Sequence, residues 1–331
     1  MSLGRHSRCP VCETANHNPP LHRFTVEQAA THFCPPWRNA ERHRRLVTCI
    51  RRLWGSDTAE VHKCGECGFG YAWPFVGGDE EFYGILHEQA GYPGWRWEYD
   101  QTVQRVLADM EGGAILDIGT GDGAFLKRLD KRWRTFATEG SEVTRSRLRA
   151  DGIHCFGSTA EALASHAGQF QVITMFQVLE HIAAFDAMLR DCRALLRPGG
   201  RLVVAVPDGD VGMVQERLTG CMDMTPNHCN KWTARSLSMA IAKAGFEPEP
   251  AVHEPPSWSK FRYRAWLRVL ARASGKPGSL TARIYGLRQR RLRLAILAVL
   301  AAASALRCLP RWREFAQGES LLVVGRRPGG G

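Results

Sequence analysis

Hydrophobic and polar positions alternate with two different periods in the middle of the chain. Short apolar runs that are rich in β-branched residues predict strands at 114–118, 134–139, 170–176 and 201–207. Segments with the helical spacing of apolar residues are 102–110, 124–132, 142–152, 184–200 and 233–246, and Pro198-Gly199-Gly200 is expected to stop the fourth of them. Strands separated by helices predict an α/β fold with a doubly wound, mostly parallel sheet.

The flanking patterns divide the chain into five stretches. Residues 1–75 are rich in Cys, His and Arg, and 76–100 form a linker. The alternating pattern fills residues 101–250, and basic helices are predicted in 251–318. Residues 319–331 contain "SLLVVGRR", which is expected to form the last strand of the sheet. Residues 251–318 are then an insertion before that strand, placed to cover a substrate pocket.

The first strand leads into a glycine-rich turn, "ILDIGTGDGAF" at 115–125. Glycine allows a tight strand-to-helix turn and a close approach of the backbone to a ligand. Gly119, Gly121 and Ala124 satisfy the dinucleotide pattern G-x-G-x-x-G/A. The D-x-G-x-G-x-G pattern of S-adenosylmethionine enzymes fits the same turn equally well. An acid at the end of the second strand, Glu139, suits a ribose in either case, so NAD and S-adenosylmethionine both stay open at this point.

Two later segments decide between these cofactors. The stretch "ITMFQVLEHI" is followed 16 residues after His181 by "RPGGRLVVAVP". With "ILDIGTGDG" and "ATEGS", this series resembles class I S-adenosylmethionine-dependent methyltransferases, and within them the branch of ubiquinone-pathway, natural-product and sugar methyltransferases. The resemblance covers residues 97–250 and rests on four motifs in order. It implies a Rossmann-like methyltransferase that binds S-adenosylmethionine.

The resemblance also implies roles for individual residues. It implies that the turn near the methionine and ribose portions of the cofactor is formed by Asp117, Gly119, Thr120, Gly121 and Gly123. Glu139 matches the ribose-binding acid, and Phe176 matches the side chain that lies against the cofactor. Family members often place an Asp near the adenine after the third strand. This chain has "CFGST" there, so Ser158 or Thr159 would have to serve.

Cysteines near the N-terminus form a second pattern. "CPVC" and "CGEC" place two C-x-x-C pairs on turns that contain Pro or Gly. Such pairs provide four thiolates for a tetrahedral Zn²⁺ site, here Cys9, Cys12, Cys64 and Cys67. The intervening 51 residues exceed the usual spacing, but "VEQAATHF" and "RNAERHRRLVTCIRRLW" predict a helical insert that loops out. Four thiolates leave no open coordination position, so the zinc is expected to be structural.

Methyl transfer from a sulfonium requires alignment of the acceptor and, for a hydroxyl group, removal of a proton. Histidine suits that task near neutral pH. His181 follows the 170–176 strand, and His228 in "TPNHCNKWT" precedes the last helix of the domain. Both are candidate bases, with Glu180 as a candidate partner.

Charge is concentrated at the C-terminal end. From Pro255 to Gly331 there are 16 basic and 2 acidic residues, against 28 basic and 31 acidic residues in the remainder. Within that segment, Leu294–Leu306 is uncharged and would span ~20 Å as a helix, less than a hydrocarbon core of ~30 Å. The segment therefore predicts either a buried helix or an interfacial anchor. An anionic membrane surface or a phosphate-bearing substrate is the expected partner.

The sequence therefore predicts a zinc-containing methyltransferase that acts on a small molecule such as a sugar, a quinone or a lipid-linked intermediate. The N-terminus lacks an apolar signal region, and eleven cysteines indicate reduced thiols, so a cytoplasmic location, peripheral to the membrane, is expected. An RNA methyltransferase is an alternative because zinc knuckles occur in nucleic-acid binders. However, the aromatic residues lie in the linker, which makes nucleic acid the less favoured partner. A non-catalytic scaffold or cofactor sensor is the other alternative.

Overall fold

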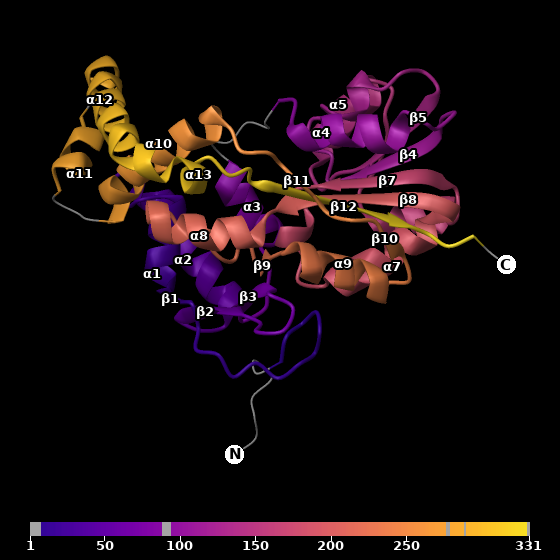
Figure 1. The fold of residues 1–331 in the computed structure, drawn as a ribbon, viewed down its shortest axis with the longest axis horizontal. Helices are drawn as coiled ribbons and strands as arrows, with labels where there is room; N and C mark the ends of the chain where they lie inside the picture. The colour runs from indigo at the N-terminus through magenta and orange to yellow at the C-terminus, as the bar shows by residue number, and fades with distance from the viewer. Residues whose placement is uncertain (1–7, 88–93, 276–278, 288, 330–331) are drawn as a thin grey trace.

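The computed structural model describes residues 8–87, 94–275, 279–287 and 289–329 (Figure 1). Its largest unit is an eight-stranded sheet of order β10-β12-β8-β7-β4-β5-β6, in which β11 also pairs with β12. The parallel strands are β4 (Gly113–Ile118), β5 (Trp133–Thr138), β6 (His154–Phe156), β7 (Phe170–Phe176) and β8 (Leu196–Pro207). The antiparallel strands at one edge are β10 (Glu247–Pro248), β11 (Val252–His253) and β12 (Ser320–Arg326). The doubly wound, mostly parallel fold is confirmed, with "SLLVVGRR" in the last strand.

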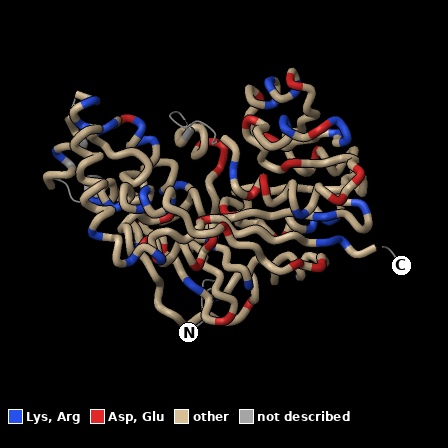
Figure 2. Tube along the Cα trace, turned by 45° about the horizontal axis from the view of Figure 1, so that its top comes forward, with Lys and Arg blue, Asp and Glu red and all other residues tan. Residues whose placement is uncertain are grey.

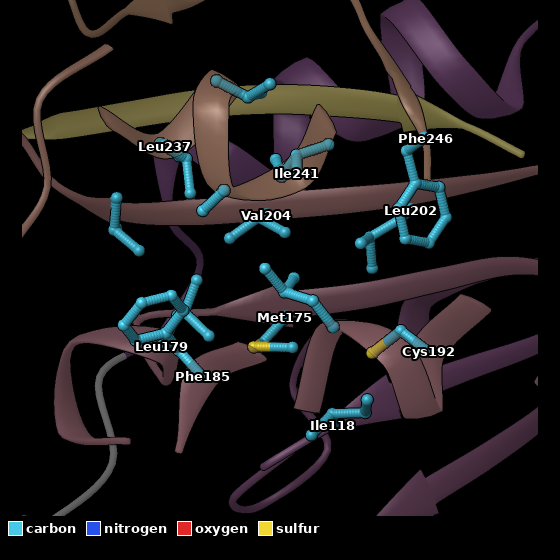
Figure 3. Close-up of a cluster of buried hydrophobic side chains, with 14 of the residues drawn as sticks. Ile118, Met175, Leu179, Phe185, Cys192, Leu202, Val204, Leu237, Ile241 and Phe246 are labelled. Atoms are coloured by element: carbon cyan, nitrogen blue, oxygen red, sulfur yellow. The ribbon is translucent and has the colours of Figure 1, made fainter. Parts of the chain in front are cut away.

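Both faces of this sheet are buried, as near-continuous apolar strands require. In β8, Leu202 and Val204 face one layer of helices, and Val203 faces the other. The helices of the first layer are α6 (Thr159–His166), α7 (Phe185–Leu195) and α9 (Ala234–Lys243), and Figure 3 shows side chains from α7 and α9 meeting those of the strands. The helical elements of the second layer are α4 (Trp97–Thr102), the π-helical turn η2 (Val103–Leu107), the 3₁₀ turn η3 (Leu126–Arg128) and α5 (Glu142–Ala150).

Two details of the predicted helices are wrong. Residues 124–132 form only the short turn η3, because Asp130 accepts hydrogen bonds from the backbone N–H groups of Arg132 and Trp133 and turns the chain into β5. Helix α7 ends at Leu195, before Pro198, and the Pro-Gly-Gly triplet lies inside β8. A residue that precedes proline is disfavoured in helical conformation, so the helix ends upstream of it.

A second, four-stranded sheet lies beneath the first in the view of Figure 1. Its strands are β1 (His22–Thr25), β2 (Thr58–Lys63), β3 (Gly70–Trp73) and β9 (Asn230–Lys231), in that order. The first three belong to the N-terminal region, whereas β9 comes from the middle of the chain. Between β1 and β2 lie α1 (Val26–Phe33), which begins with a capping box at Thr25, and α2 (Ala40–Trp54). The insert between the two cysteine pairs contains both predicted helices, but it also contains β1 and β2, which the sequence analysis did not predict.

The remaining helices lie around the carboxyl ends of the large sheet or beyond them. They are α3 (Glu80–His87), α8 (Gly209–Thr219), α10 (Trp258–Gly275), α11 (Leu280–Tyr285), α12 (Arg290–Cys308), the 3₁₀ turn η5 (Leu309–Arg311) and α13 (Trp312–Phe315). Figure 1 shows α11 and α12 at the end of the molecule opposite the strands β4 and β5. Within the described residues, the continuous helix Arg291–Phe315 is long and apolar enough to cross a membrane by length and composition, with a mean hydropathy of 1.9.

The predicted alternative of a buried C-terminal helix is wrong. Only 11% of the apolar window of the Arg291–Phe315 helix is buried. Leu297 and Cys308 are buried in α12, whereas Val299 and Leu306 are 69% and 68% exposed. The physical reason is that α12 packs mainly on α10, with smaller contacts to α11 and η5, and these contacts leave Val299 and Leu306 uncovered.

Candidate functional site

The glycine turn lies where the strand order reverses, between β4 and its neighbours β5 and β7. Ligands bind at this switch point in open α/β sheets, beyond the carboxyl ends of the strands. Asp117 is the residue before the last of β4 and accepts a hydrogen bond of 2.7 Å from the Thr174 hydroxyl group. Burial raises the pKa of the Asp117 carboxyl group to about 6, against the opposing effect of that hydrogen bond. Gly119 follows with φ +69°, and a Cβ atom there would lie 2.7 Å from Val178 Cγ2.

The predicted ribose acid contacts this turn directly. The Gly121 N–H donates to Glu139 Oε2 at 3.2 Å, and the Ser141 N–H donates to Oε1 at 3.0 Å. The buried Thr120 and Gly123 complete the turn through a backbone hydrogen bond of 3.1 Å. Sequence positions 117–123 and 139 are therefore brought together as predicted.

The two residues considered for the adenine contact have other partners. The Ser158 hydroxyl group caps helix α6 by accepting from the Glu161 N–H. The Thr159 hydroxyl group donates to Asp191 at 3.5 Å. These contacts give Ser158 a structural role at the start of α6.

Phe176 ends β7 inside an aromatic cluster. Its ring lies 4.9 Å from that of Tyr99 and 5.0 Å from that of Phe125, measured between centroids. The next residue, Gln177, has φ +57°, a left-handed conformation that is uncommon outside glycine. Its amide group donates to Glu98 and Ser320 at 3.4 Å each. The sequence analysis missed Gln177, because a strained backbone leaves no mark in a sequence pattern.

A cavity of about 860 Å³ opens at this edge of the sheet. Gln177, Asp208 and Ser320 line it from the ends of three adjacent strands, and α8 and α10 form further walls. Helix α10 contributes Lys260, Tyr263, Arg264 and Leu267. The C-terminal insertion therefore borders the cavity, as the sequence predicts.

The three predicted catalytic residues meet beside this cavity. Glu180 and His181 belong to the 3₁₀ turn Leu179–His181, and His228 lies in the loop before β9. The rings of His181 and His228 are 4.6 Å apart between centroids. The His181 Nδ1 atom lies 2.7 Å from the carbonyl oxygen of Asn227, which places a proton on that nitrogen. Of the three, His228 is in the wall of the cavity.

An acid that the sequence analysis missed completes the group. Asp223 Oδ1 lies 2.6 Å from His228 Nδ1, and Asp223 Oδ2 lies 3.0 Å from the Lys231 ammonium group. Burial opposes ionisation of Asp223, but the charges of His228 and Lys231 outweigh it and hold its pKa below the usual range. Burial likewise acts to lower the pKa of His228, but Asp223 outweighs it and the pKa is raised. The only sequence signal for Asp223 was its position five residues before the candidate base His228.

Glu180 differs from Asp223 in protonation. Its carboxyl group is 1% exposed, and burial raises its pKa to about 7. The His181 Nε2 atom is 3.9 Å from Glu180 Oε1. The site therefore contains one carboxyl group that stays ionised and one that changes protonation near neutral pH.

The four N-terminal cysteines also converge. Cys9 Sγ lies 3.6 Å from Cys67 Sγ, Cys12 Sγ lies 3.5 Å from Cys64 Sγ, and all four sulfur atoms lie within 4.8 Å of one another. Tetrahedral Zn–S bonds of ~2.3 Å require S···S separations of ~3.8 Å. The described thiols thus have the chemistry and the spacing of a Zn²⁺ site.

This cluster is connected to the loop that carries His228. Strand β3, which follows the second cysteine pair, pairs with β9 through Gly70 opposite Lys231 and Tyr71 opposite Asn230. The Thr233 hydroxyl group also donates to the carbonyl oxygen of Cys67 at 3.0 Å. The N-terminal region therefore holds the chain on the carboxyl side of His228.

Comparison with known proteins agrees with this geometry. The profile of a family described as "Methyltransferase domain" matches residues 95–251. A ubiquinone biosynthesis O-methyltransferase of Cereibacter sphaeroides is 30% identical over 179 residues, which are 49% of this chain and 72% of that protein. The chain belongs to the S-adenosylmethionine-dependent methyltransferases. A homologous ubiquinone biosynthesis O-methyltransferase of Parvibaculum lavamentivorans is 30% identical over 155 residues, 43% of this methyltransferase and 61% of that protein.

Among solved structures, a SAM-dependent methyltransferase of Archaeoglobus fulgidus is similar to this methyltransferase with a TM-score of 0.46 and 14% identity. The match covers 74% of this chain and all of that chain (100%).

The residues present fit S-adenosylmethionine. The turn at Gly119 has no side chain and directly abuts Val178, which precedes the turn that contains Glu180 and His181. The Glu139 carboxylate lies at the end of β5 with two backbone N–H groups as its donors. Asp117, Glu139 and the glycine turn would hold the cofactor in this methyltransferase.

Proposed function

We propose that this methyltransferase methylates a hydroxyl group of a small amphipathic molecule, with His228 as the general base. The observation that carries this proposal is the 2.6 Å pair of His228 Nδ1 and Asp223 Oδ1 in the cavity wall. Because Nδ1 faces the ionised Asp223 carboxylate at ion-pair distance, Nδ1 holds a proton and Nε2 is the ring nitrogen that can accept one. When bound, S-adenosylmethionine supplies an electrophilic methyl group on a sulfonium.

The protein's part in the reaction is to orient the acceptor and to remove its proton. His228 takes the proton at Nε2, and the ionised Asp223 stabilises the resulting imidazolium. Helices α8 and α10 close the sides of the cavity. The Glu180 carboxyl group lies behind the two histidines and adjusts the charge of the group with pH.

The shape of the site supports an acceptor with an apolar portion. A second cavity of about 560 Å³ adjoins the first, since Cys221, Met222 and Leu267 line both. Phe24, Trp37 and Met224 add apolar walls to it. The relatives named for ubiquinone biosynthesis support a hydroxylated quinone precursor, whose ring would lie near His228 and whose tail would occupy the second cavity.

We also propose one Zn²⁺ on Cys9, Cys12, Cys64 and Cys67, in a structural role. Its support is the convergence of four sulfur atoms and the pairing of β3 with β9. We also propose a reducing, cytoplasmic environment, which the eleven cysteines of the sequence favour. The basic helices after residue 251 provide a surface for an anionic partner.

The test is methyl transfer to a short-chain hydroxylated ubiquinone precursor by the full chain. His228→Ala is expected to lower kcat by ~10²–10⁴-fold, the usual contribution of a general base. The affinity for S-adenosylmethionine, measured by calorimetry, should stay unchanged. His17→Ala, at an exposed site in the N-terminal region, is the matched control and should leave kcat intact.

An unchanged rate in His228→Ala would contradict the assignment of the base. Cofactor binding with no methylation of quinone precursors, sugars or lipids would favour a scaffold or sensor. Methylation of RNA instead would show that the acceptor class is wrong.

A further inference from the structure

Helix α12 has an exposed face without a charge over most of its length. Its 19 residues extend about 28 Å at 1.5 Å per residue. Between Arg293 and Arg307 the sequence has no charged residue. The exposed apolar residues, which recur every three or four positions and continue into η5, are Leu292, Leu294, Ala295, Ala298, Val299, Ala302, Ala303, Leu306 and Leu309. We call this set the outer face of α12.

The opposite side of the helix accounts for its packing within the protein. Leu297 and Cys308 are buried there, and the Arg268 guanidinium group on α10 donates to Cys308 Sγ at 3.6 Å. The exposure of the outer face is therefore not explained by a missing contact between α12 and the rest of the protein. The outer face is the second side of a helix whose first side is already in contact with α10, and soluble proteins rarely expose a continuous apolar surface of this kind without a partner.

Basic residues surround this face. From Trp258 to Cys308 the sequence contains twelve basic residues and no acidic residue. Arg291 and Arg293 lie at the start of α12, and Arg307, Arg311 and Arg313 lie at or after its end. Figure 2 shows Lys and Arg along these helices. An apolar strip with cationic ends complements a surface that is apolar inside and anionic outside.

We propose that the outer face of α12 lies in the interfacial layer of an anionic membrane, with the helix axis parallel to the bilayer. Burial of the apolar side chains and attraction of the arginines to anionic headgroups act together in this arrangement. The parallel orientation follows from the contact with α10, which a membrane-spanning α12 would lose. This surface goes beyond the proposed catalytic function and does not depend on it.

Charge argues against the other occupants. Two copies of the outer face packed on each other, in either direction, would bring arginine clusters of like charge together. Nucleic acid would meet thirteen uncharged positions, Leu294–Leu306, where a phosphate backbone requires cations. An anionic bilayer satisfies both the apolar strip and its basic ends.

The position of α10 links this surface to the active site. One side of α10 packs on α12, and the same helix lines the cavity with Tyr263 and Arg264 and both cavities with Leu267. Arg264 fixes α10 to α13, the helix that precedes β12, by donating to the carbonyl oxygen of Phe315 at 2.7 Å. A membrane bound at the outer face would thus lie one helix away from the proposed acceptor site. Only this link between the membrane and the acceptor site rests on the proposed function.

The experiment measures sedimentation of the full chain with vesicles of phosphatidylcholine, alone or mixed with phosphatidylglycerol. We expect binding to the anionic vesicles that weakens as salt rises, because headgroup attraction is screened. Val299→Glu and Leu306→Glu, each on the outer face, should weaken that binding about tenfold or more. Val143→Glu is the matched control, since Val143 is 64% exposed on α5, and it should bind as the unmodified chain does.

Several results would overturn the proposal. Binding that is equal for neutral and anionic vesicles would exclude the basic ends as a determinant. Unchanged vesicle binding by both outer-face variants would show that this face is not the contact. A shift from dimer to monomer in those variants, with vesicle binding retained, would assign the face to a second copy, and salt-sensitive retention of RNA in place of vesicles would assign it to nucleic acid. Circular dichroism of the variants checks that they fold, and none of these readouts requires methyl transfer.

Discussion

His228 lies close to two acids whose protonation differs: Asp223 at 2.6 Å and Glu180 within 4.8 Å. Asp223 is held ionised by the charges of His228 and Lys231, which outweigh its burial. Glu180 has a pKa of about 7, because burial outweighs the opposing charge of His228. Acid and base roles are commonly separated in this way, by environments that push the pKa values of neighbouring groups apart. The proposed base is therefore most effective above the pKa of His228, when the ring is neutral.

This reasoning predicts a pH profile for Asp223→Asn. A general base must be neutral, so the rate should fall as pH decreases through the pKa of His228, which Asp223 raises above its ordinary 6.5. Loss of the carboxylate removes the stabilisation of the imidazolium, so the acidic limb of kcat should move to lower pH and the maximal kcat should decrease. Asp186→Asn, at an exposed ion pair on α7, should keep the original limb. An acidic limb that does not move in Asp223→Asn would show that His228 does not control it.

Candidate site residues that lie beside a sequence motif could be predicted from the sequence, whereas site residues outside any motif could not. Glu180 and His181 follow the 170–176 strand, whose end any parallel sheet places at the ligand edge. His228 was inferred from its position before the last helix. Asp223 depends on how the loop from Cys221 to Cys229 folds, and Gln177 depends on its positive φ. Neither property has a hydrophobic period or a fixed spacing to reveal it.

At the scale of elements, the pairing of β3 with β9 was outside the reach of sequence patterns. Strand β9 has only two residues and is separated from β3 by more than 150 positions. It can form because the cysteine cluster and the buried ring of Phe69 fix the preceding chain against Trp232, with ring centroids 4.6 Å apart. The same sequence patterns did predict β4, β7 and β12, whose apolar residues alternate between the two faces of the sheet.

This connection predicts that the proposed zinc site supports catalysis from a distance. Cys64→Ser should reduce the zinc content from about one ion per chain to a small fraction of that, because a structural site needs all four thiolates. We expect kcat to fall about tenfold or more as β9 and the His228 loop lose their support, with little change in affinity for S-adenosylmethionine. Metal analysis, kinetics and calorimetry measure the three quantities.

Cys34→Ser is the matched control in the same region. The Cys34 thiol donates to the carbonyl oxygen of Asn39 at 3.7 Å, a contact that a serine hydroxyl group can replace. This variant should retain zinc and activity. Zinc-free protein purified without chelator would exclude the metal, and full activity of Cys64→Ser after loss of zinc would exclude the coupling to the His228 loop.

At the scale of the whole molecule, the chain separates its charge from its cofactor site. The excess of basic residues lies in the last quarter of the sequence, and the described ones lie on α10–α13, in η5 and at the end of β12. The glycine turn and Glu139 follow β4 and β5, at the end of the molecule opposite α11 and α12 (Figure 1). The proposed membrane contact and the proposed cofactor site therefore lie at opposite ends of the molecule, and α10 lies between the membrane contact and the acceptor cavity.

This arrangement predicts that a membrane promotes turnover only for acceptors that reside in it. Vesicles containing phosphatidylglycerol should raise kcat/KM for a long-tailed hydroxylated ubiquinone precursor about tenfold or more over neutral vesicles, because docking concentrates enzyme and acceptor at one surface. The rate with a short-chain, water-soluble precursor should stay unchanged. Val299→Glu should lose the stimulation and keep the short-chain rate, whereas Val143→Glu should keep both. Equal stimulation of both precursors, or stimulation that survives Val299→Glu, would show that docking at α12 does not deliver the acceptor to the cavity lined by α10.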